Sequence, residues 1–219
     1  KMNKIKKLKR FQVGKIFRMD NPEVKKGRFR EFYQVDLDIV GDYDQLTSEI
    51  EIFWLINKTL QDLNIKDYEI KYNYCQNLQS MCNKIGVFDK DCIKLICTSI
   101  DKLDKYSWDY IEKELTYLTK EQIDELKSLL DMNYLDDTLK EYNDKINKYC
   151  TNMNFDSKLS RGLSYYTGII YEVKARGFKN TIIAGGRYDG LVDGLPSIGV
   201  SFGINRIRLL ANPIEDKVK

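Results

Sequence analysis

Bulky apolar residues alternate with polar residues along two stretches near the N-terminus, in the pattern of half-buried strands. The first covers residues 11–18 (FQVGKIFR) and the second covers residues 31–40 (EFYQVDLDIV). Between them lies a charged loop that contains the breaker Asp20-Asn21-Pro22. The pattern predicts two strands joined by a long loop, and in the second strand one face carries the set Phe32, Gln34, Asp36 and Asp38.

Apolar residues then recur at helical spacing over residues 48–63, which predicts a helix that Asn64 closes. Residues 68–72 predict a short strand. Residues 73–150 hold one glycine, Gly86, and no proline, and their charged residues interleave with Leu, Ile and Tyr three or four positions apart. Near Thr119 the run T-K-E-Q fits a capping box, so we expect a break between two helices there. We interpret residues 73–150 as a helical insertion whose charges form a solvated face.

Residues 151–219 are rich in glycine and predict strands again. The runs GIIYEVKA and SIGVSFGI are strand-like, and INRIRLLANP predicts the start of a helix that stops at Pro213. Neither β-rich part is long enough to close a domain alone, so we expect both to share one sheet. The fold class is therefore α+β, with residues 1–72 and 151–219 forming the core around the insertion.

Composition narrows the function classes. The 219 residues are 42% hydrophobic, which suits one domain or a core with one insertion. The 36 Lys and Arg nearly balance the 33 Asp and Glu, so a nucleic-acid partner needs a local basic patch. No run approaches the roughly 20 apolar residues of a membrane span, and the basic N-terminus does not resemble a signal peptide.

The chain has no histidine and its five cysteines form no C-x-x-C pair. This excludes zinc sites with imidazole ligands and mechanisms that use a catalytic histidine of this chain. Buried thiols in a reducing compartment are the simplest interpretation, and they favour a cytoplasmic location.

Four stretches carry candidate chemistry. The predicted hairpin has several guanidinium groups and the aromatic Phe32, which suit the phosphates and the base of a nucleoside triphosphate. A solvated loop in which the arginines pair with acidic neighbours is the alternative, and composition alone favours it; the residues concerned are Arg18, Arg28, Arg30, Asp20, Glu23 and Glu31.

The second stretch, LSRGLSYYTG (residues 159–168), puts a cation and two phenols near one turn, either to clamp a small polar substrate or as a hairpin edge with core tyrosines. The glycine pair of AGGRYDGL (184–191) allows close backbone approach, although a tight turn between strands explains it equally. GVSFGINR (199–206) is the fourth. The glycine-rich loops of P-loop and dinucleotide-binding folds are absent from the sequence.

Together and in this order, the four stretches resemble the class II aminoacyl-tRNA synthetases, and specifically the histidyl-tRNA synthetases of the eukaryotic cytosolic kind. FRMDNPEVKKGRFREFYQVDLDIVG resembles motif 2, LSRGLSYYTGIIYEV and AGGRYDGLV resemble the two histidine signatures, and SIGVSFGINRI resembles motif 3. ICTSIDKLDKYSW (residues 96–108) resembles the segment inserted in this family. The resemblance implies an antiparallel class II sheet flanked by helices.

The resemblance also implies site residues. Arg18, Arg161 and Arg206 are the expected catalytic cations, with Arg18 on the ATP α-phosphate and the histidine carboxylate and Arg161 beside the α-phosphate. The expected ATP-binding residues are Arg18, Asp20, Arg28, Phe32 and Arg206, with Phe32 stacked on adenine and Arg28 and Arg206 on the γ-phosphate side. The expected histidine-binding residues are Arg18, Gln34, Asp38, Arg161, Tyr165, Tyr166 and Gly186. Gln34 is expected on the α-amino group and Asp38 with Tyr166 on the imidazole, while no residue is expected to bind a metal.

The implied reaction activates L-histidine with ATP and Mg²⁺ to histidyl-adenylate and transfers histidine to histidine tRNA. A carboxylate is already nucleophilic at neutral pH, so a protein base is not required. The implied partners are L-histidine, histidine tRNA and, in the full-length protein, a second copy in a homodimer; no membrane is expected. The insertion is expected near the tRNA acceptor arm.

Several departures from the family pattern lead to further expectations. Ser164 stands where Asp is usual, and Asn205 replaces an acidic residue before the motif 3 arginine. The chain opens just before motif 2, so motif 1 and the anticodon-binding domain are expected to be absent and the chain alone to have little activity. The alternative function is a synthetase-like tRNA-sensing or regulatory domain without catalysis.

Overall fold

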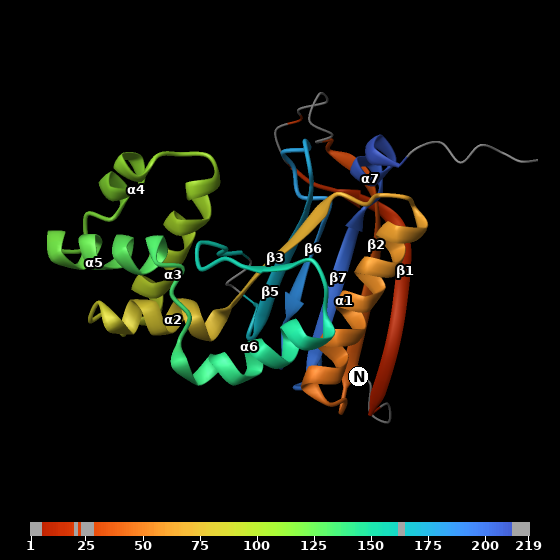
Figure 1. The fold of residues 1–219 in the computed structure, drawn as a ribbon, viewed down its shortest axis with the longest axis horizontal. Coiled ribbons are helices and arrows are strands. Elements are labelled where there is room, and N and C mark those ends of the chain that lie inside the picture. The colour runs from red at the N-terminus through yellow and green to blue at the C-terminus, as the bar shows by residue number, and fades with distance from the viewer. Residues whose placement is uncertain (1–5, 20–21, 23–28, 162–164, 212–219) are drawn as a thin grey trace, which may run out of the picture.

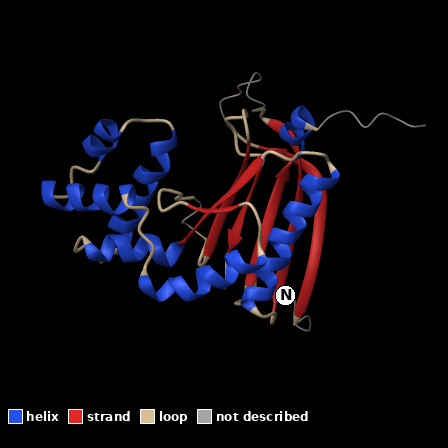
Figure 2. Cartoon of the chain, viewed as in Figure 1, coloured by secondary structure: helices blue, strands red, loops and turns tan. Residues whose placement is uncertain are grey.

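The computed structural model describes residues 6–19, 22, 29–161 and 165–211, and the strands of these ranges form one seven-stranded sheet (Figure 1). Helices lie over one face of the sheet and gather beside it, as the colouring by secondary structure shows (Figure 2). The elements follow in the order β1 (Lys7–Phe17), β2 (Glu31–Gly41), α1 (Gln45–Asp62), β3 (Tyr68–Tyr74), α2 (Cys75–Lys84), α3 (Lys90–Ile100), η2 (Asp101–Asp104), α4 (Trp108–Glu114), α5 (Lys120–Asp131), α6 (Asp137–Tyr149), β4 (Met153–Phe155), β5 (Ile169–Ala175), β6 (Ile183–Arg187), β7 (Ser197–Gly203) and α7 (Ile204–Leu210).

The strand order is β1-β2-β7-β6-β5-β3-β4, so β5, β6 and β7 from the C-terminal part lie between β2 and β3 from the N-terminal part. This confirms the prediction that the two β-rich parts share a sheet. The sheet is antiparallel except between β3 and β4, which run parallel. In the register of β2 and β7, Gln34 lies opposite Gly203 and Asp38 lies opposite Gly199. The fold is α+β, as predicted.

Three predicted elements were shorter than the observed ones. β1 begins at Lys7 instead of residue 11, because its basic first residues also pair with β2 along the edge of the sheet. α1 begins at Gln45 instead of residue 48, because the side chain of Asp44 accepts a hydrogen bond from the Thr47 amide at 2.8 Å and caps the helix earlier. β3 continues to Tyr74, since it pairs with β5 over its whole length.

The glycine pair of AGGRYDGL lies inside a strand, so the interpretation as a turn was wrong for these two residues. Gly185 and Gly186 belong to β6, which pairs with β5 and β7. A Cβ on Gly185 would lie 2.2 Å from the carbonyl oxygen of Gly199 and 2.4 Å from the hydroxyl oxygen of Tyr171. Neighbouring groups therefore approach the backbone closely at this position, which was the other interpretation of the pair.

The predicted capping box is present. Thr119 caps α5, and its side chain and that of Gln122 exchange hydrogen bonds with each other's backbone amides at 3.3 and 3.0 Å. α2 to α5 enclose a hydrophobic cluster of their own, whereas Tyr142 and Ile146 of α6 pack on the cluster between α1 and the sheet. In Figure 1, α6 runs beside α1 while α2 to α5 form a separate group.

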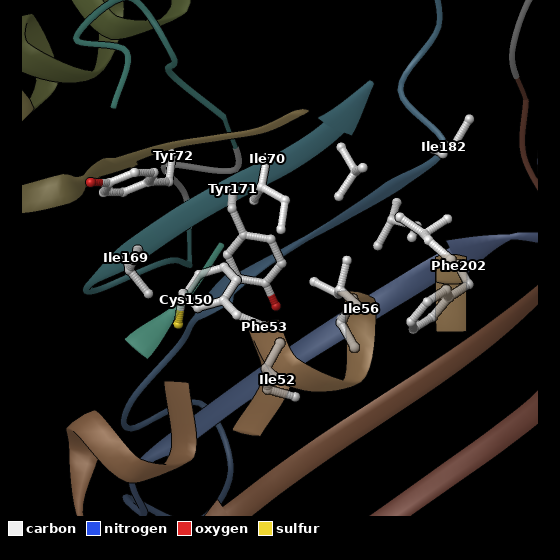
Figure 3. Packing of buried hydrophobic residues seen from close by; sticks show 14 of the residues in the cluster. Ile52, Phe53, Ile56, Ile70, Tyr72, Cys150, Ile169, Tyr171, Ile182 and Phe202 are labelled. Atoms are coloured by element: carbon white, nitrogen blue, oxygen red, sulfur yellow. The ribbon is translucent and has the colours of Figure 1, made fainter. Parts of the chain in front are cut away.

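The cluster between α1 and the sheet fixes the strands that carry the candidate site. In Figure 3 the rings of Phe53 and Tyr171 lie against each other, and their centroids are 4.9 Å apart in an edge-to-face arrangement. The hydroxyl of Tyr171 donates to the carbonyl oxygen of Gly199 at 2.7 Å. Tyr171 thus adds a side-chain bond between β5 and β7, the two strands that pair with β6 on either side.

Among the described residues no helix is both long and apolar enough to cross a membrane. The five cysteines form no disulfide.

Candidate functional site

A cavity of about 330 Å³ opens on the sheet where β2, β6 and β7 meet the segment that precedes β5. Predicted site residues from three of the four sequence stretches line it together, namely Arg18, Phe32, Gln34, Arg161, Tyr165, Tyr166 and Arg206. Two other predicted residues, Asp38 and Gly186, are not among its lining residues. Asp20 and Arg28 lie outside the described residues, as does Ser164.

Arg18 and Phe32 form the hairpin side of the cavity. The guanidinium carbon of Arg18, just after β1, lies 5.3 Å from the ring centroid of Phe32 on β2. This is a cation–π distance. Glu31, which the solvated-loop interpretation paired with an arginine, forms an ion pair of 2.7 Å with Lys15. The hairpin therefore presents a cation and an aromatic ring side by side.

Arg161 is held from beneath by a buried carboxylate. Its Nη1 lies 2.5 Å from Oε2 of Glu172 on β5 and 3.2 Å from the hydroxyl of Thr181. The side chain of Glu172 is only 4% exposed, and it also accepts bonds from Lys174 at 2.8 Å and Thr181 at 2.8 Å. This charge-assisted bond keeps Nη1 of Arg161 beside Glu172 and so restrains the position of the guanidinium.

The two tyrosines of the first histidine signature lie together beside the cavity. The ring centroids of Tyr165 and Tyr166 are 4.3 Å apart. Burial, followed by the hydrogen bond with Tyr165, raises the pKa of Tyr166 above its usual value, so its phenol is protonated at neutral pH. A Cβ on Gly186 would lie 2.9 Å from the Tyr166 ring. Glycine is needed there because the ring lies directly against the backbone of β6.

The start of α7 supplies Arg206 and Asn205. The Nη1 of Arg206 donates to the carbonyl oxygen of Thr181 at 2.6 Å. The Oδ1 of Asn205 accepts a hydrogen bond of 2.8 Å from the backbone amide of Tyr33. β7 ends opposite Gln34, so the Asn205 side chain continues the pairing of β2 by one residue. The family's acidic residue is thus replaced by a side chain with a structural partner.

Asp38 is not among the residues that line the cavity, and both of its carboxylate oxygens have partners. Its Oδ2 accepts from Arg10 Nε at 2.8 Å, and its Oδ1 accepts from the hydroxyl of Tyr188. Burial, and then the bond to Asp38, raises the pKa of Tyr188. A Cβ on Gly199 would lie 2.5 Å from Asp38 Oδ1, so the absence of a side chain there leaves room for the pair.

Sequence reasoning missed three residues of this arrangement. Tyr188 was visible within AGGRYDGL but was given no role, although it is the phenol that contacts Asp38. Glu172 interrupts the apolar run GIIYEVKA, and a charge in a buried strand signals a partner. Nothing in the sequence pointed to Thr181, because it lies in a loop and is far in sequence from Arg161 and Arg206, which it contacts in the folded chain.

Acidic and thiol side chains do not gather into a metal site within the described ranges: these hold no group of three or more His, Cys, Asp or Glu residues suited to an ion.

Comparison with known proteins gives a consistent result. Residues 2–207 match the family model described as Histidyl-tRNA synthetase. The chain is 35% identical to a Caenorhabditis elegans protein named Histidine--tRNA ligase, with 94% of the chain and 50% of that protein aligned. It is 34% identical to a cytoplasmic histidine--tRNA ligase of Dictyostelium discoideum, over 100% of the chain and 52% of that protein. The chain thus spans about half the length of these relatives.

Solved structures show the same fold. A histidyl-tRNA synthetase from Nostoc sp. PCC 7120 aligns with a TM-score of 0.73 and 24% identity, covering 92% of this chain and 53% of that one. A Bacillus halodurans protein described as an ATP phosphoribosyltransferase regulatory subunit/histidyl-tRNA synthetase aligns with a TM-score of 0.77 and 15% identity, covering 96% and 60%.

Proposed function

Since the chain belongs to the histidyl-tRNA synthetase family, we propose that it forms the active-site core of a histidine–tRNA ligase. The protein would activate L-histidine with ATP and transfer it to histidine tRNA in protein biosynthesis. The observation that carries this proposal is the convergence of three guanidinium groups, from Arg18, Arg161 and Arg206, on one cavity. The aromatic ring of Phe32 and the amide of Gln34 line the same space.

In the proposed reaction a histidine carboxylate oxygen attacks the α-phosphorus of ATP. The new bond joins that oxygen to phosphorus, and the bond from phosphorus to the bridging oxygen of the β-phosphate breaks, so pyrophosphate leaves. Arg18 and Arg161 stabilise the negative charge on the carboxylate and the α-phosphate. A protein base is not needed, because the attacking oxygen carries no proton at neutral pH.

The ATP is proposed to lie along the hairpin and α7. Phe32 would stack on adenine, and Arg206 would contact the distal phosphates, helped by Asp20 and Arg28 from outside the described residues. ATP is expected to bring Mg²⁺ with it. The described side chains do not form a site for the ion on their own, so we assign it no step.

The histidine is proposed to lie on the other side of the cavity. Gln34 would accept a bond from its α-amino group, and Tyr165 and Gly186 would form the wall. Tyr166 would meet the imidazole together with Asp38, whose carboxylate is already oriented by Tyr188. Imidazole has two ring nitrogens, and a phenol with a carboxylate can bond to both.

Residues 73–150 are proposed as the insertion and residues 1–72 and 151–219 as the two parts of the catalytic core. Histidine tRNA and a second copy in a homodimer are the proposed macromolecular partners, and the cytoplasm the proposed location. Cytoplasmic enzymes stand among the relatives, which supports that location.

Histidine-dependent exchange of pyrophosphate into ATP tests the proposal, measured on the chain and on the longest natural protein that contains it. In the natural protein we expect exchange with histidine and not with other amino acids, and its loss in Arg161→Ala, whereas the chain alone is expected to show little exchange. Lys58→Met, which changes an exposed pair with Asp62 on α1, is the matched control and keeps exchange. An absence of exchange in the natural protein, with tRNA binding intact, would establish the sensing or regulatory alternative.

A further inference from the structure

Arg187 is a buried cation that lies at the end of β6, outside the proposed reaction. Its side chain is 4% exposed, and its Nε lies 2.7 Å from the carboxylate of Glu49 on α1, which is fully buried. Its Nη2 donates to the hydroxyl of Ser48 at 2.8 Å and to the carbonyl oxygen of Gln45 at 3.2 Å. A buried ion pair of this kind is costly to desolvate and adds little net stability over apolar packing, so its role need not be stability.

Arg187 contacts the first of two tyrosine-bearing segments, residues 165–168, which contains Tyr165 and Tyr166. Its backbone carbonyl accepts a hydrogen bond of 2.8 Å from the amide of Thr167, the residue after Tyr166. Its side-chain stem lies against Gly168, where a Cβ would be 2.9 Å from its Cδ. The segment of Tyr165 and Tyr166 is therefore joined to β6 by a backbone bond at residue 187, and the arginine side chain packs against the same segment at Gly168.

The side chain of Arg187 also bonds to the second tyrosine-bearing segment, residues 188–189, which contains Tyr188. Its Nη1 lies 3.1 Å from Oδ1 of Asp189, and that oxygen also accepts from the amide of Ser197 at 2.8 Å. The amide of Asp189 donates in turn to the hydroxyl of Thr167 at 2.9 Å, which closes a ring between the two segments. Tyr188, which orients Asp38, lies between Arg187 and Asp189.

A third contact extends the network to α6. The hydroxyl of Tyr142 donates to Glu49 at 2.7 Å. Burial raises the pKa of Glu49, while Arg187 opposes the rise. Glu49 therefore bonds to both Arg187 and Tyr142, and the guanidinium of Arg187 bonds both to α1 and to Asp189. Only one orientation of the guanidinium keeps all of these bonds.

We propose that Arg187 is a positioning residue for histidine recognition: through Thr167, Gly168 and Asp189 it sets Tyr166 and Tyr188 at fixed places relative to each other. The inference rests on the proposed function only for the identity of the ligand. It differs from a purely structural role because both of its loop contacts carry residues assigned to the histidine side. Among the described residues, the hydrogen bonds that make up this network join Arg187 to α1, Asp189, Thr167 and Ser197, and the proposed ATP side is formed by other residues, Arg18, Phe32 and Arg206.

The test compares the dissociation constants of L-histidine and ATP, measured by calorimetry on the whole chain, in Arg187→Lys and Asp189→Asn. Arg187→Lys keeps a charge beside Glu49 but loses the fork that reaches Ser48 and Asp189. Asp189 is 41% exposed, so Asp189→Asn leaves the buried pair intact and folds even if the first variant does not. We expect histidine to bind about 10-fold more weakly in each variant, with ATP binding unchanged, because small displacements of binding groups are costly.

Lys71→Met is the matched control. It removes a partly buried ion pair of 2.9 Å between Lys71 on β3 and Asp156, the residue after β4, and neither residue belongs to the two segments. Equal weakening of histidine and ATP in the Arg187 and Asp189 variants, or weakening of histidine in Lys71→Met too, would reduce Arg187 to a structural residue and overturn the inference.

Hydrogen exchange supplies a readout that needs no ligand. In Arg187→Lys the amides of Thr167, Tyr188 and Ser197 are expected to exchange at least about 10-fold faster while α1 keeps its protection. Should the unchanged chain bind ATP but no histidine, the proposed function fails, and this measurement alone decides whether Arg187 couples the segments. Unchanged exchange in both segments contradicts the coupling.

Discussion

The guanidinium of Arg161 and the carboxylate of Glu172 form an ion pair of 2.5 Å, in which the cation lines the cavity and the anion is buried within β5. Both side-chain contacts of Arg161 with Glu172 and Thr181 use the same nitrogen, Nη1. The proposed catalytic cation is thus paired with a residue of the central sheet.

This pair predicts that Glu172→Gln lowers histidine-dependent pyrophosphate exchange by about 10-fold or more, because Arg161 loses the charge that orients it. Initial rates at saturating ATP and histidine measure the effect. Lys174→Met is the control: Lys174 is the other cation on Glu172, and its loss leaves the Arg161 pair in place. If both variants lower the rate equally, the orientation of Arg161 is not the cause.

Asn205 is predicted to accept an acidic replacement without loss of stability. In Asn205→Asp a carboxylate oxygen can still accept from the Tyr33 amide, so the melting temperature should stay within about 2 °C. Asn205→Ala leaves that amide to solvent and should cost about 1 kcal/mol. Thermal unfolding followed by circular dichroism measures both, and a large drop in Asn205→Asp alone would show that a neutral side chain is required.

Gly185→Ala should be severely destabilising, by about 3 kcal/mol or more, because its Cβ would meet a backbone oxygen and a buried hydroxyl that cannot withdraw. Gly14→Ala on the edge strand β1 is the matched control. Its Cβ would meet only the side chain of Gln12, at 3.5 Å, so it should be neutral or slightly stabilising. Urea unfolding of the two variants tests the contrast, and similar midpoints would contradict the close approach seen at Gly185.

The cap of α6 predicts a dependence of stability on pH. The hydrogen bond from Ser80, followed by those from Thr138, lowers the pKa of Asp136 from 3.8 to about 2. A carboxyl with a lowered pKa stabilises the folded state fully above pH 3.8, and this contribution is lost as the pH falls toward 2. Asp136→Ala should therefore cost about 1 kcal/mol at pH 6 and much less at pH 2.5.

Urea unfolding at several pH values measures the difference between the unchanged chain and this variant. Asp137→Ala, at an 88% exposed side chain that pairs only with Lys140, is the control and should change stability little at any pH. A difference for Asp136→Ala that persists unchanged at pH 2.5 would show that the charge of Asp136 is not what stabilises the cap.

Much of the fold could be predicted because local patterns carry it. The alternation of β2, the capping box at Thr119 and the helical spacing of α1 each depend on residues close in sequence, and all three elements are present. The strand β6 was missed as a strand because its glycines are turn-forming by propensity. Their place is decided by Tyr171 and Gly199, which are distant in the chain.

The sequence could predict which residues line the cavity better than it could predict which of them bond to one another. Arg18, Arg161 and Arg206 could be selected by their motifs, and they line one cavity. Asp38 and Tyr166 were both expected on the imidazole of histidine, which stays a prediction, but the sequence could not show that a second phenol contacts Asp38 in the folded chain. In the structure that phenol belongs to Tyr188.

The position of β7 has a consequence for synthesis on the ribosome. β7 is the last strand of the described chain, yet it lies between β2 and β6, with Gln34 paired to Gly203. A nascent chain therefore carries β2 with one open edge until nearly all described residues have emerged, and pairing over such a separation is slow. The wall of the cavity that β7 and α7 supply is completed only in that final step, and until then β2 presents an open edge on which other chains can pair.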